Sequence, residues 1–268
     1  MRILTYNVHG WQLPEGGSNV DHVAQVIGAT QADIVGLNEV FHLQEAGGQP
    51  ALDALGDRLG MRYAFGATLP ADPHKHPPYG NAMLSRWPIL AHAAHHLEPA
   101  VSYGKRGLFE CRIQLPAGPT LTVYVTHFDH RSEQTRVQQW VAAKSWLLRD
   151  RNRLHLLLGD FNALSATDYA DAMAIERLTG YQADRGWPVP AFDLVAHVLD
   201  SGYIDCFAAA GNPSAQGATF PAEAPERRID YIFMPGAMSG TLRACAPVRT
   251  SLASAASDHL PVLAEIAV

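Results

Sequence analysis

Lysine is scarce in this chain. Three of its 20 basic residues are lysines, and the formal net charge is -6 at pH 7. A protein that binds duplex DNA usually carries a basic surface, because the neutralisation of phosphates supplies much of its affinity. The charge balance therefore predicts no strong binding to duplex DNA, although it leaves room for a local basic cleft.

Cysteine and long apolar runs are also in short supply. Cys111, Cys206 and Cys245 are odd in number and far apart, so they form neither a zinc-binding spacing nor an evident disulfide framework. We expect free thiols in a reducing compartment, and hence a cytoplasmic protein. No apolar run of about 18 residues exists, which predicts no transmembrane segment. The stretch from Met1 to Tyr6 predicts a strand and leaves no room for a signal peptide.

Apolar residues, in contrast, are plentiful. They make up 47% of the 268 residues, and charged residues make up 17%, which is typical of a globular protein with a large core. Length alone allows one or two domains.

The most informative stretch runs from Leu156 to Asn162. Three leucines lead into Gly159, and Asp160 and Asn162 follow two positions apart. An apolar run closed by glycine predicts a buried strand that ends at a tight turn. Residues i and i+2 point to the same side, so a carboxylate and a carboxamide can face one point beyond the sheet. Alone, the segment is more often a plain turn, since Gly, Asp and Asn all favour turns.

Further polar side chains stand where other predicted strands end or begin. They are Asn7, Glu39, His127, Asp258 and His259. Each taken singly has an ordinary structural explanation, as a solvated loop acid or a hydrogen-bonded histidine. Together they predict one crevice at a sheet edge.

Asp230 is a different case, because it interrupts the predicted strand Arg227–Phe233. Strands disfavour Asp, and a buried carboxylate needs a partner. We expect Asp230 to be buried and paired with a histidine. The alternative is a structural acid bonded to the backbone or to Arg228.

Helical periodicity is predicted after Ser18, which can cap that helix, and near residues 50–59, 132–149, 168–178 and 191–199. The helix at 132–149 is predicted to pack through a stripe that includes Val141 and Leu148. Loops are predicted at 11–18, 68–79 and 208–226. We expect the Pro- and His-rich loop 68–79 to rim any active site.

The chemistry of the polar set points to a hard cation. Carboxylates and carboxamides suit Mg²⁺, and Mn²⁺ is possible, because both prefer oxygen ligands. Acids and histidines without cysteine argue against a structural zinc site. The set fits metal-assisted attack on phosphorus.

At this point a family resemblance emerges. The chain resembles the endonuclease/exonuclease/phosphatase superfamily, which includes apurinic endonucleases, deoxyribonucleases, neutral sphingomyelinases and inositol polyphosphate 5-phosphatases. The matching segments follow the family's order: residues 5–10, 36–40, 80–86, 126–127, 159–162, 228–232 and 257–261. The resemblance implies one catalytic domain over residues 1–268. It also implies a four-layer α/β sandwich of two packed mixed, mostly antiparallel sheets with outer helices.

The resemblance also implies a metal site. Glu39 would be the principal Mg²⁺ ligand with Asn7 beside it, and Asp258 would belong to the metal shell. Asp160 would share the metal site and orient or deprotonate the attacking water.

The same resemblance implies catalytic roles. His259 would face the scissile phosphate with Asp230 as its carboxylate partner, while Asn162 would bind a phosphate oxygen and His127 would stabilise the phosphorane oxygens. The residues expected to bind substrate are Asn81, His9 and Arg106.

Departures from the family pattern narrow the function. The apurinic endonucleases carry Asp at the position of His9 and no histidine at that of His127, so both residues count against an abasic-site nuclease. Asn38 replaces the commoner Gln before the metal-binding Glu39.

We therefore predict a Mg²⁺-dependent phosphodiesterase, a monomer, acting on a small or lipid-derived phosphodiester. One alternative is a nuclease for single-stranded or damaged nucleic acid. The other is a catalytically silent interaction module with the same fold, against which the complete set of site residues argues.

Overall fold

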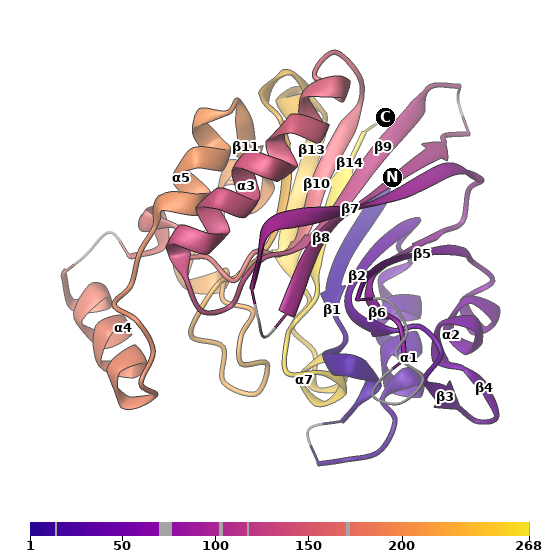
Figure 1. The fold of residues 1–268 in the computed structure, drawn as a ribbon, viewed down its shortest axis with the longest axis horizontal. Coiled ribbons are helices and arrows are strands. Elements are labelled where there is room, and N and C mark those ends of the chain that lie inside the picture. Colours follow the sequence, from indigo (N-terminus) through magenta and orange to yellow (C-terminus); the bar gives the residue numbers. More distant parts are fainter. Residues whose placement is uncertain (14, 70–76, 102–103, 117, 170–171, 268) are drawn as a thin grey trace.

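Two six-stranded sheets lie face to face at the centre of the protein, as Figure 1 shows for the computed structural model. The structure describes residues 1–13, 15–69, 77–101, 104–116, 118–169 and 172–267. In the first sheet the strand order is β13-β14-β1-β2-β6-β5, and β1 and β2 form its parallel pair. Its strands are β1 (Arg2–Asn7), β2 (Ile34–Phe41), β5 (Arg62–Leu69), β6 (Tyr79–Ser85), β13 (Leu242–Pro247) and β14 (Val262–Ile266).

The second sheet has the order β11-β12-β10-β9-β8-β7, with β9 and β10 parallel. Its strands are β7 (Ile89–Val101), β8 (Gly104–Gln114), β9 (Thr120–His127), β10 (His155–Asp160), β11 (Tyr203–Asp205) and β12 (Asp230–Pro235). A separate small hairpin is formed by β3 (Glu45–Ala46) and β4 (Gln49–Pro50).

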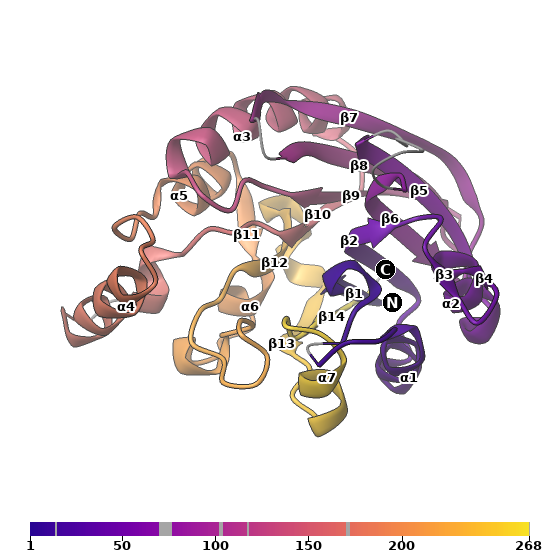
Figure 2. The same cartoon turned by 60° about the horizontal axis from the view of Figure 1, so that its bottom comes forward.

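Helices cover the outer faces of both sheets (Figures 1 and 2). On the first sheet these are α1 (Val20–Thr30), α2 (Ala51–Leu59) and α7 (Ser251–Ala256), and on the second α3 (Glu133–Leu147) and α5 (Asp193–Asp200). In both views α4 (Ala172–Asp184) projects at one end of the molecule. The short elements are α6 (Cys206–Ala209), η1 (His9–Trp11), η2 (Leu148–Asp150), η3 (Ala166–Tyr169), η4 (Ser214–Gln216) and η5 (Gly236–Thr241).

The alternation of side chains along the strands produces the layers. In β10, Leu156 and Leu158 belong to the core between the sheets, whereas Leu157 belongs to the core under α3 and α5. A Cβ at Gly36 of β2 would lie 2.2 Å from the Leu158 side chain, so the two sheets meet closely there. The predicted four-layer α/β sandwich with mixed, mostly antiparallel sheets is confirmed.

Several local predictions need correction. The residue before α1 is Asn19, not Ser18, and its amide donates to the carbonyls of Val8, Gln12 and Ala256. In α3 the buried stripe runs through Trp140, Ala143 and Leu147, so Val141 and Leu148 are 66% and 48% exposed. The predicted stripe was too wide for a helix with one covered face.

The remaining corrections concern boundaries. The helix predicted at 168–178 is α4, which begins four residues later and runs to Asp184, and the loop predicted at 208–226 contains η4. Asp230 begins β12 and does not lie in its middle. Residues 70–76 of the Pro- and His-rich loop lie outside the described residues. The three cysteines are buried and free, as predicted.

None of the helices in the described ranges is long and apolar enough to cross a bilayer.

Candidate active site

The predicted polar residues gather where strands of the second sheet end. Asp160 closes β10 and lies opposite His127 of β9 in the parallel pair and opposite Asp230 of β12 in the antiparallel pair. The parallel strand β9 ends at the same edge of the sheet as β10, and the antiparallel strand β12 begins there. The side chains of His127, Asp160 and Asp230 therefore meet at that edge. Asn7, at the end of β1, reaches Asp160 from the first sheet with Nδ2 3.1 Å from Oδ2.

Gly159 lets β10 end in this way. Its φ is +138°, and a Cβ there would lie 1.9 Å from the carbonyl oxygen of Thr126 in β9. No side chain fits such an approach, so glycine is needed immediately before Asp160.

Backbone strain is concentrated at the same place. Among described non-glycine residues, a positive φ occurs at His9, Glu39 and Asn162, and elsewhere at Trp11 and Gln31. Gln31 ends α1, where a left-handed residue is ordinary. Glu39 lies where the β2–β6 register shifts, between Leu37 and Val40. Three predicted site residues are thus held in a costly conformation, which is typical of functional sites.

Asp230 and His259 form the expected pair. The Nδ1 atom of His259 lies 2.9 Å from Asp230 Oδ2, and the Thr219 hydroxyl donates to the same oxygen at 2.6 Å. Burial disfavours a charged imidazole, but the carboxylates of Asp230 and Asp160 outweigh it and raise the pKa of His259 to about 10. Arg228 bonds to Asp168 and Asp205, so the alternative partner of Asp230 is engaged elsewhere.

Asp160 lies at the centre of the site. Its Oδ1 accepts the Asn162 backbone N–H at 2.8 Å, and its Oδ2 lies 3.4 Å from His127 Nε2 and 3.8 Å from His259 Nε2. Burial raises the pKa of Asp160 to about 7, against the opposing charge of His259. A carboxyl group tuned in this way can accept a proton near neutral pH.

Arg106 supports the second imidazole. Its Nη1 lies 3.0 Å from Nδ1 of His127, and its Nη2 lies 3.0 Å from Nδ1 of His130. Arginine only donates, so Nδ1 of His127 accepts and Nε2 carries the hydrogen. Burial and the charge of Arg106 lower the pKa of His127 well below its usual range. His127 is therefore a neutral donor that points Nε2–H at Asp160 and, at 4.0 Å, at Glu39. The substrate-binding role predicted for Arg106 stays a prediction.

Asn7 joins the two carboxylates. Its Nδ2 lies 3.2 Å from Glu39 Oε1 as well as 3.1 Å from Asp160 Oδ2, while its Oδ1 accepts the His9 backbone N–H at 3.1 Å. The amide orientation follows from these partners, so a nitrogen faces the acids. The predicted place of Asn7 beside the principal metal ligand Glu39 is seen, and its role as a metal ligand stays a prediction.

The side chains of Asn38 and Asn81 in the first sheet form hydrogen bonds to the second sheet next to the site. The Asn38 side chain donates to Asn81 Oδ1 and to the Thr126 carbonyl and accepts the Asp160 backbone N–H, all at 2.9 Å. The Asn81 amide donates to the carbonyls of Gly107 and Val125. Both side chains are buried and hydrogen-bonded, so they support the site, and the substrate-binding role predicted for Asn81 stays a prediction.

His9 and Asp258 form a separate, more open pair. His9 Nε2 lies 3.9 Å from Asp258 Oδ2, and both side chains are about one-third exposed, at 38% and 34%. The neighbouring Ser257 hydroxyl donates to the Asn7 carbonyl at 2.7 Å, which ties the C-terminal segment to β1. The roles predicted for His9 and Asp258 stay predictions.

The donor set fits a hard divalent cation. Among described residues, the acids and histidines with ligand atoms within 4.8 Å of one another are Asp160, Asp230 and His259. Nδ1 of His259 is bonded to Asp230 and the nearby carboxylates raise the pKa of its imidazole to about 10, which favours a charged ring over a cation ligand. Glu39 and Asp160, which share the Asn7 amide, offer oxygens instead. Two carboxylates this close repel each other, and a divalent ion relieves that repulsion.

Sequence reasoning missed two residues that complete the site. Thr219 is fully buried and bonds to Asp230, and the Phe220 ring lies 4.9 Å from the His259 ring. Both lie in the segment 208–226, for which the sequence predicted a loop without a role. No local pattern marks a threonine or phenylalanine there, because their partners are distant in sequence.

The fold and the site together define an α/β-sandwich protein with an acidic, histidine-containing centre at its strand ends. The chain belongs to the Endonuclease/Exonuclease/phosphatase family, whose sequence profile matches residues 4–259. Members of this family are generally hydrolases that act on phosphoesters.

Solved structures agree on the fold. An endonuclease/exonuclease/phosphatase from Beutenbergia cavernae is 20% identical, with a TM-score of 0.69, and the match covers 100% of this chain and 72% of that chain. A mannosyl-6-phosphatase from Bacteroides thetaiotaomicron is 18% identical, with a TM-score of 0.70 and full coverage of both chains.

The human Nocturnin catalytic domain, solved with bound sulfate, is 18% identical with a TM-score of 0.67, covering 98% of this chain and 92% of that chain. Proteins with curated functions gave no match.

Proposed function

We propose that the protein is a Mg²⁺- or Mn²⁺-dependent phosphodiesterase that hydrolyses a small or lipid-derived phosphodiester by in-line attack of water. One observation carries the proposal. Asp160 Oδ2 lies within 3.8 Å of two imidazole Nε2 atoms, one backed by the carboxylate of Asp230 and the other by the guanidinium of Arg106. A proton acceptor between two proton donors suits transfer of a phosphoryl group to water.

Each group has a task in this reaction. Asp160 accepts the proton of the attacking water. His259, held by Asp230, donates from Nε2 to an oxygen of the scissile phosphate, where negative charge grows during attack. His127 donates from Nε2 without bringing a charge of its own. One N–H of the Asn162 amide is bonded to the Phe128 carbonyl, and the other N–H can donate to a phosphate oxygen.

Glu39 and Asp160 are the residues that would hold the metal, and Asn7 fixes the distance between them. A divalent ion at that position supplies charge neutralisation on the phosphoryl oxygens. The net charge of -6 favours a small or lipid-derived substrate over duplex DNA.

A nuclease for single-stranded nucleic acid is the second candidate. The observation in its favour is a set of arginine and aromatic side chains beside the site, with Arg227 over the rings of Trp187 and Phe220. Aromatic and arginine surfaces are typical of single-strand binding.

The test is a metal-dependent activity screen on the purified protein. It compares bis-p-nitrophenyl phosphate, p-nitrophenyl phosphate, sphingomyelin and single-stranded DNA, each with Mg²⁺, with Mn²⁺ and with chelator. We expect turnover of a diester that chelator abolishes. Glu39→Gln should lose on the order of 10²-fold or more in kcat while the fold persists, since an acid at a cleft does not stabilise the protein.

Glu45→Gln is the matched control, because Glu45 is an exposed acid in β3. Full activity of Glu39→Gln in the presence of chelator would sink the metal proposal.

A further inference from the structure

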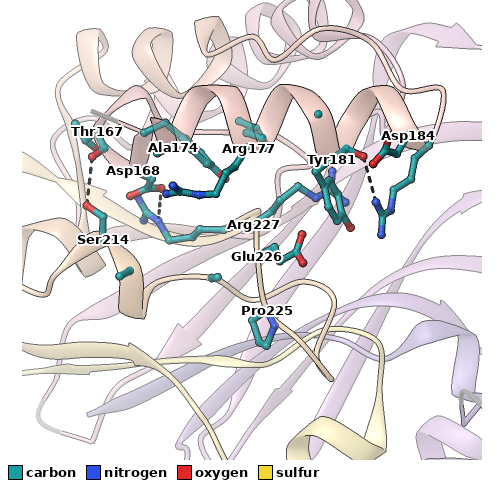
Figure 3. Close-up of a pocket in the computed structure, with 17 residues that line it drawn as sticks. Thr167, Asp168, Ala174, Arg177, Tyr181, Asp184, Ser214, Pro225, Glu226 and Arg227 are labelled. Carbon is teal, nitrogen blue, oxygen red and sulfur yellow. Dashed lines mark hydrogen bonds and ion pairs between the residues drawn. The ribbon is translucent and has the colours of Figure 1, made fainter. Parts of the chain in front are cut away.

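A groove of about 1050 Å³ lies beside the active site, between α4 and the segment at residues 225–228 (Figure 3). Ser214 and Ala218 close it on a third side. Its size is that of a pocket for a small-molecule ligand. None of the catalytic groups described above lines it.

Arg227 is the distinctive residue of this groove. Its guanidinium carbon lies 4.2 Å from the centre of the Trp187 ring and 4.9 Å from that of Phe220. The Nε atom is buried without a hydrogen-bond partner, and no ion pair to Arg227 occurs among the described residues. A guanidinium whose faces are covered by rings can still donate through its two Nη groups, and such a pair can bind phosphate in a bidentate manner.

The other charges of the groove leave Arg227 uncompensated. Asp168 is engaged by Arg228 through two hydrogen bonds, at 2.8 and 3.1 Å. Asp184 and Glu226 are exposed, so water screens them, whereas Arg227 is half-buried. Arg177 adds a second cation without a partner in the described part of the chain.

Phe220 connects the groove to the catalytic centre. Its ring lies 4.9 Å from the His259 ring on one side and 4.9 Å from the Arg227 guanidinium on the other. The backbones of Phe220 and Arg227 also bond to each other in both directions, at 3.0 and 2.9 Å. Arg227 therefore has a fixed position relative to His259, with the Phe220 ring in contact with both.

We propose that this groove binds a second phosphate of the substrate through Arg227 and Arg177, while the scissile phosphoester lies at Asp160 and His259. The inference rests on the proposed function and narrows its substrate class to phosphoesters that carry two or more phosphates. A phosphocholine headgroup is disfavoured, because its cation would face two unpaired arginines.

The experiment uses two chromogenic substrates that differ in one group. They are thymidine 5′-(p-nitrophenyl phosphate) with and without a 3′-phosphate, assayed with Mg²⁺. We expect the 3′-phosphate to lower KM about 10- to 100-fold, the scale of charge-assisted hydrogen bonds to a phosphate. Arg227→Gln should bring the ratio of the two KM values close to one, and Arg227→Lys should keep part of it. Arg243→Gln, at an exposed arginine of β13, should leave the ratio as it is in the unaltered protein.

Two further measurements separate the possible outcomes. Thymidine 3′,5′-bisphosphate and inositol 1,4-bisphosphate, tested as competitive inhibitors, show whether the second phosphate belongs to a nucleotide or to an inositol ring. Inhibition by neither contradicts the inference. Calorimetric titration of thymidine 3′,5′-bisphosphate into the unaltered protein and Arg227→Gln tests the groove without catalysis.

The unaltered protein could bind the bisphosphate, lose this binding in Arg227→Gln, and yet hydrolyse no phosphodiester. That result would support the groove assignment and refute the phosphodiesterase proposal. Turnover of both thymidine substrates with equal KM would support the phosphodiesterase proposal and refute the groove assignment. If Arg227→Gln lowers the melting temperature, the KM values of the two thymidine substrates are compared in Arg177→Gln instead.

Discussion

Replacing Asp230 by Asn tests the contribution of the negative charge that Asp230 places next to His259. The side chain keeps its size, and Oδ2 of Asp230 already accepts two hydrogen bonds, from His259 Nδ1 at 2.9 Å and from the Thr219 hydroxyl at 2.6 Å. Two donors at one position require an oxygen there, so the new amide must place its NH₂ group where Oδ1 now lies. That position is buried and has no partner.

The expected effects on stability and activity differ greatly in size. One unsatisfied buried amide costs about 1–3 kcal/mol, which lowers the melting temperature by several degrees. The loss of charge leaves burial opposed mainly by Asp160, so the pKa of His259 falls from about 10. The protonated imidazole then persists only to a lower pH, and the alkaline limb of the pH–rate profile moves down. We expect kcat to fall on the order of 10²- to 10⁴-fold.

The assay measures kcat, its pH profile and the melting temperature on the same preparation. Asp205→Asn is the control, because Asp205 is also buried but bonds to Arg228. That variant should lose stability and keep kcat. A normal kcat in Asp230→Asn with a lowered melting temperature would refute the role of the pair.

Three further predictions concern other groups. Arg106→Met removes the donor to His127 Nδ1, so the neutral imidazole should populate both tautomers in ¹⁵N NMR spectra and kcat should fall about 10²-fold; a single Nε2–H tautomer would contradict this. Burial favours a protonated Asp150, but bonds from Thr122, Tyr124 and Arg153 hold its pKa below the usual range. Its stabilisation is thus present above the unfolded pKa of about 3.9 and lost as pH falls below it, so Asp150→Asn should lower the melting temperature at pH 7 and leave it nearly unchanged at about pH 3. Duplex DNA should bind no better than about 10⁻⁵ M at physiological salt, and nanomolar affinity with a steep salt dependence would promote the nuclease candidate.

Structural features that depend on residues close together in the sequence could be predicted. The strand 156–160 and its glycine were predictable because an apolar run and a turn former are local signals. The pairing of Asp230 was expected from a single misplaced polar residue in an apolar strand. The uses of Asn7, Asn38 and Asn81 could not be predicted, because an amide serves as ligand or support depending on which atoms face it.

The groove escaped prediction for a related reason. Arg227 and Phe220 become neighbours through a backbone bridge that no local pattern marks, and Trp187 reaches them from the far end of α4. Of the arginines, the sequence singled out Arg106 as a substrate-binding residue and Arg228 as a possible partner of Asp230, and it gave no role to Arg227. Burial between rings, which decides its role, is a property of the assembled fold.

The position of β14 makes the candidate site depend on residues from distant parts of the chain. This strand lies between β13 and β1, and His259 precedes it by three residues. A chain whose synthesis stops before Ser257 lacks the imidazole, the Ser257 tie to Asn7 and the strand that covers β1. The candidate site is therefore assembled only once β14 has paired with β1. A fragment that lacks β14 would present an unpaired edge of β1, the kind of surface that makes incomplete chains prone to aggregate.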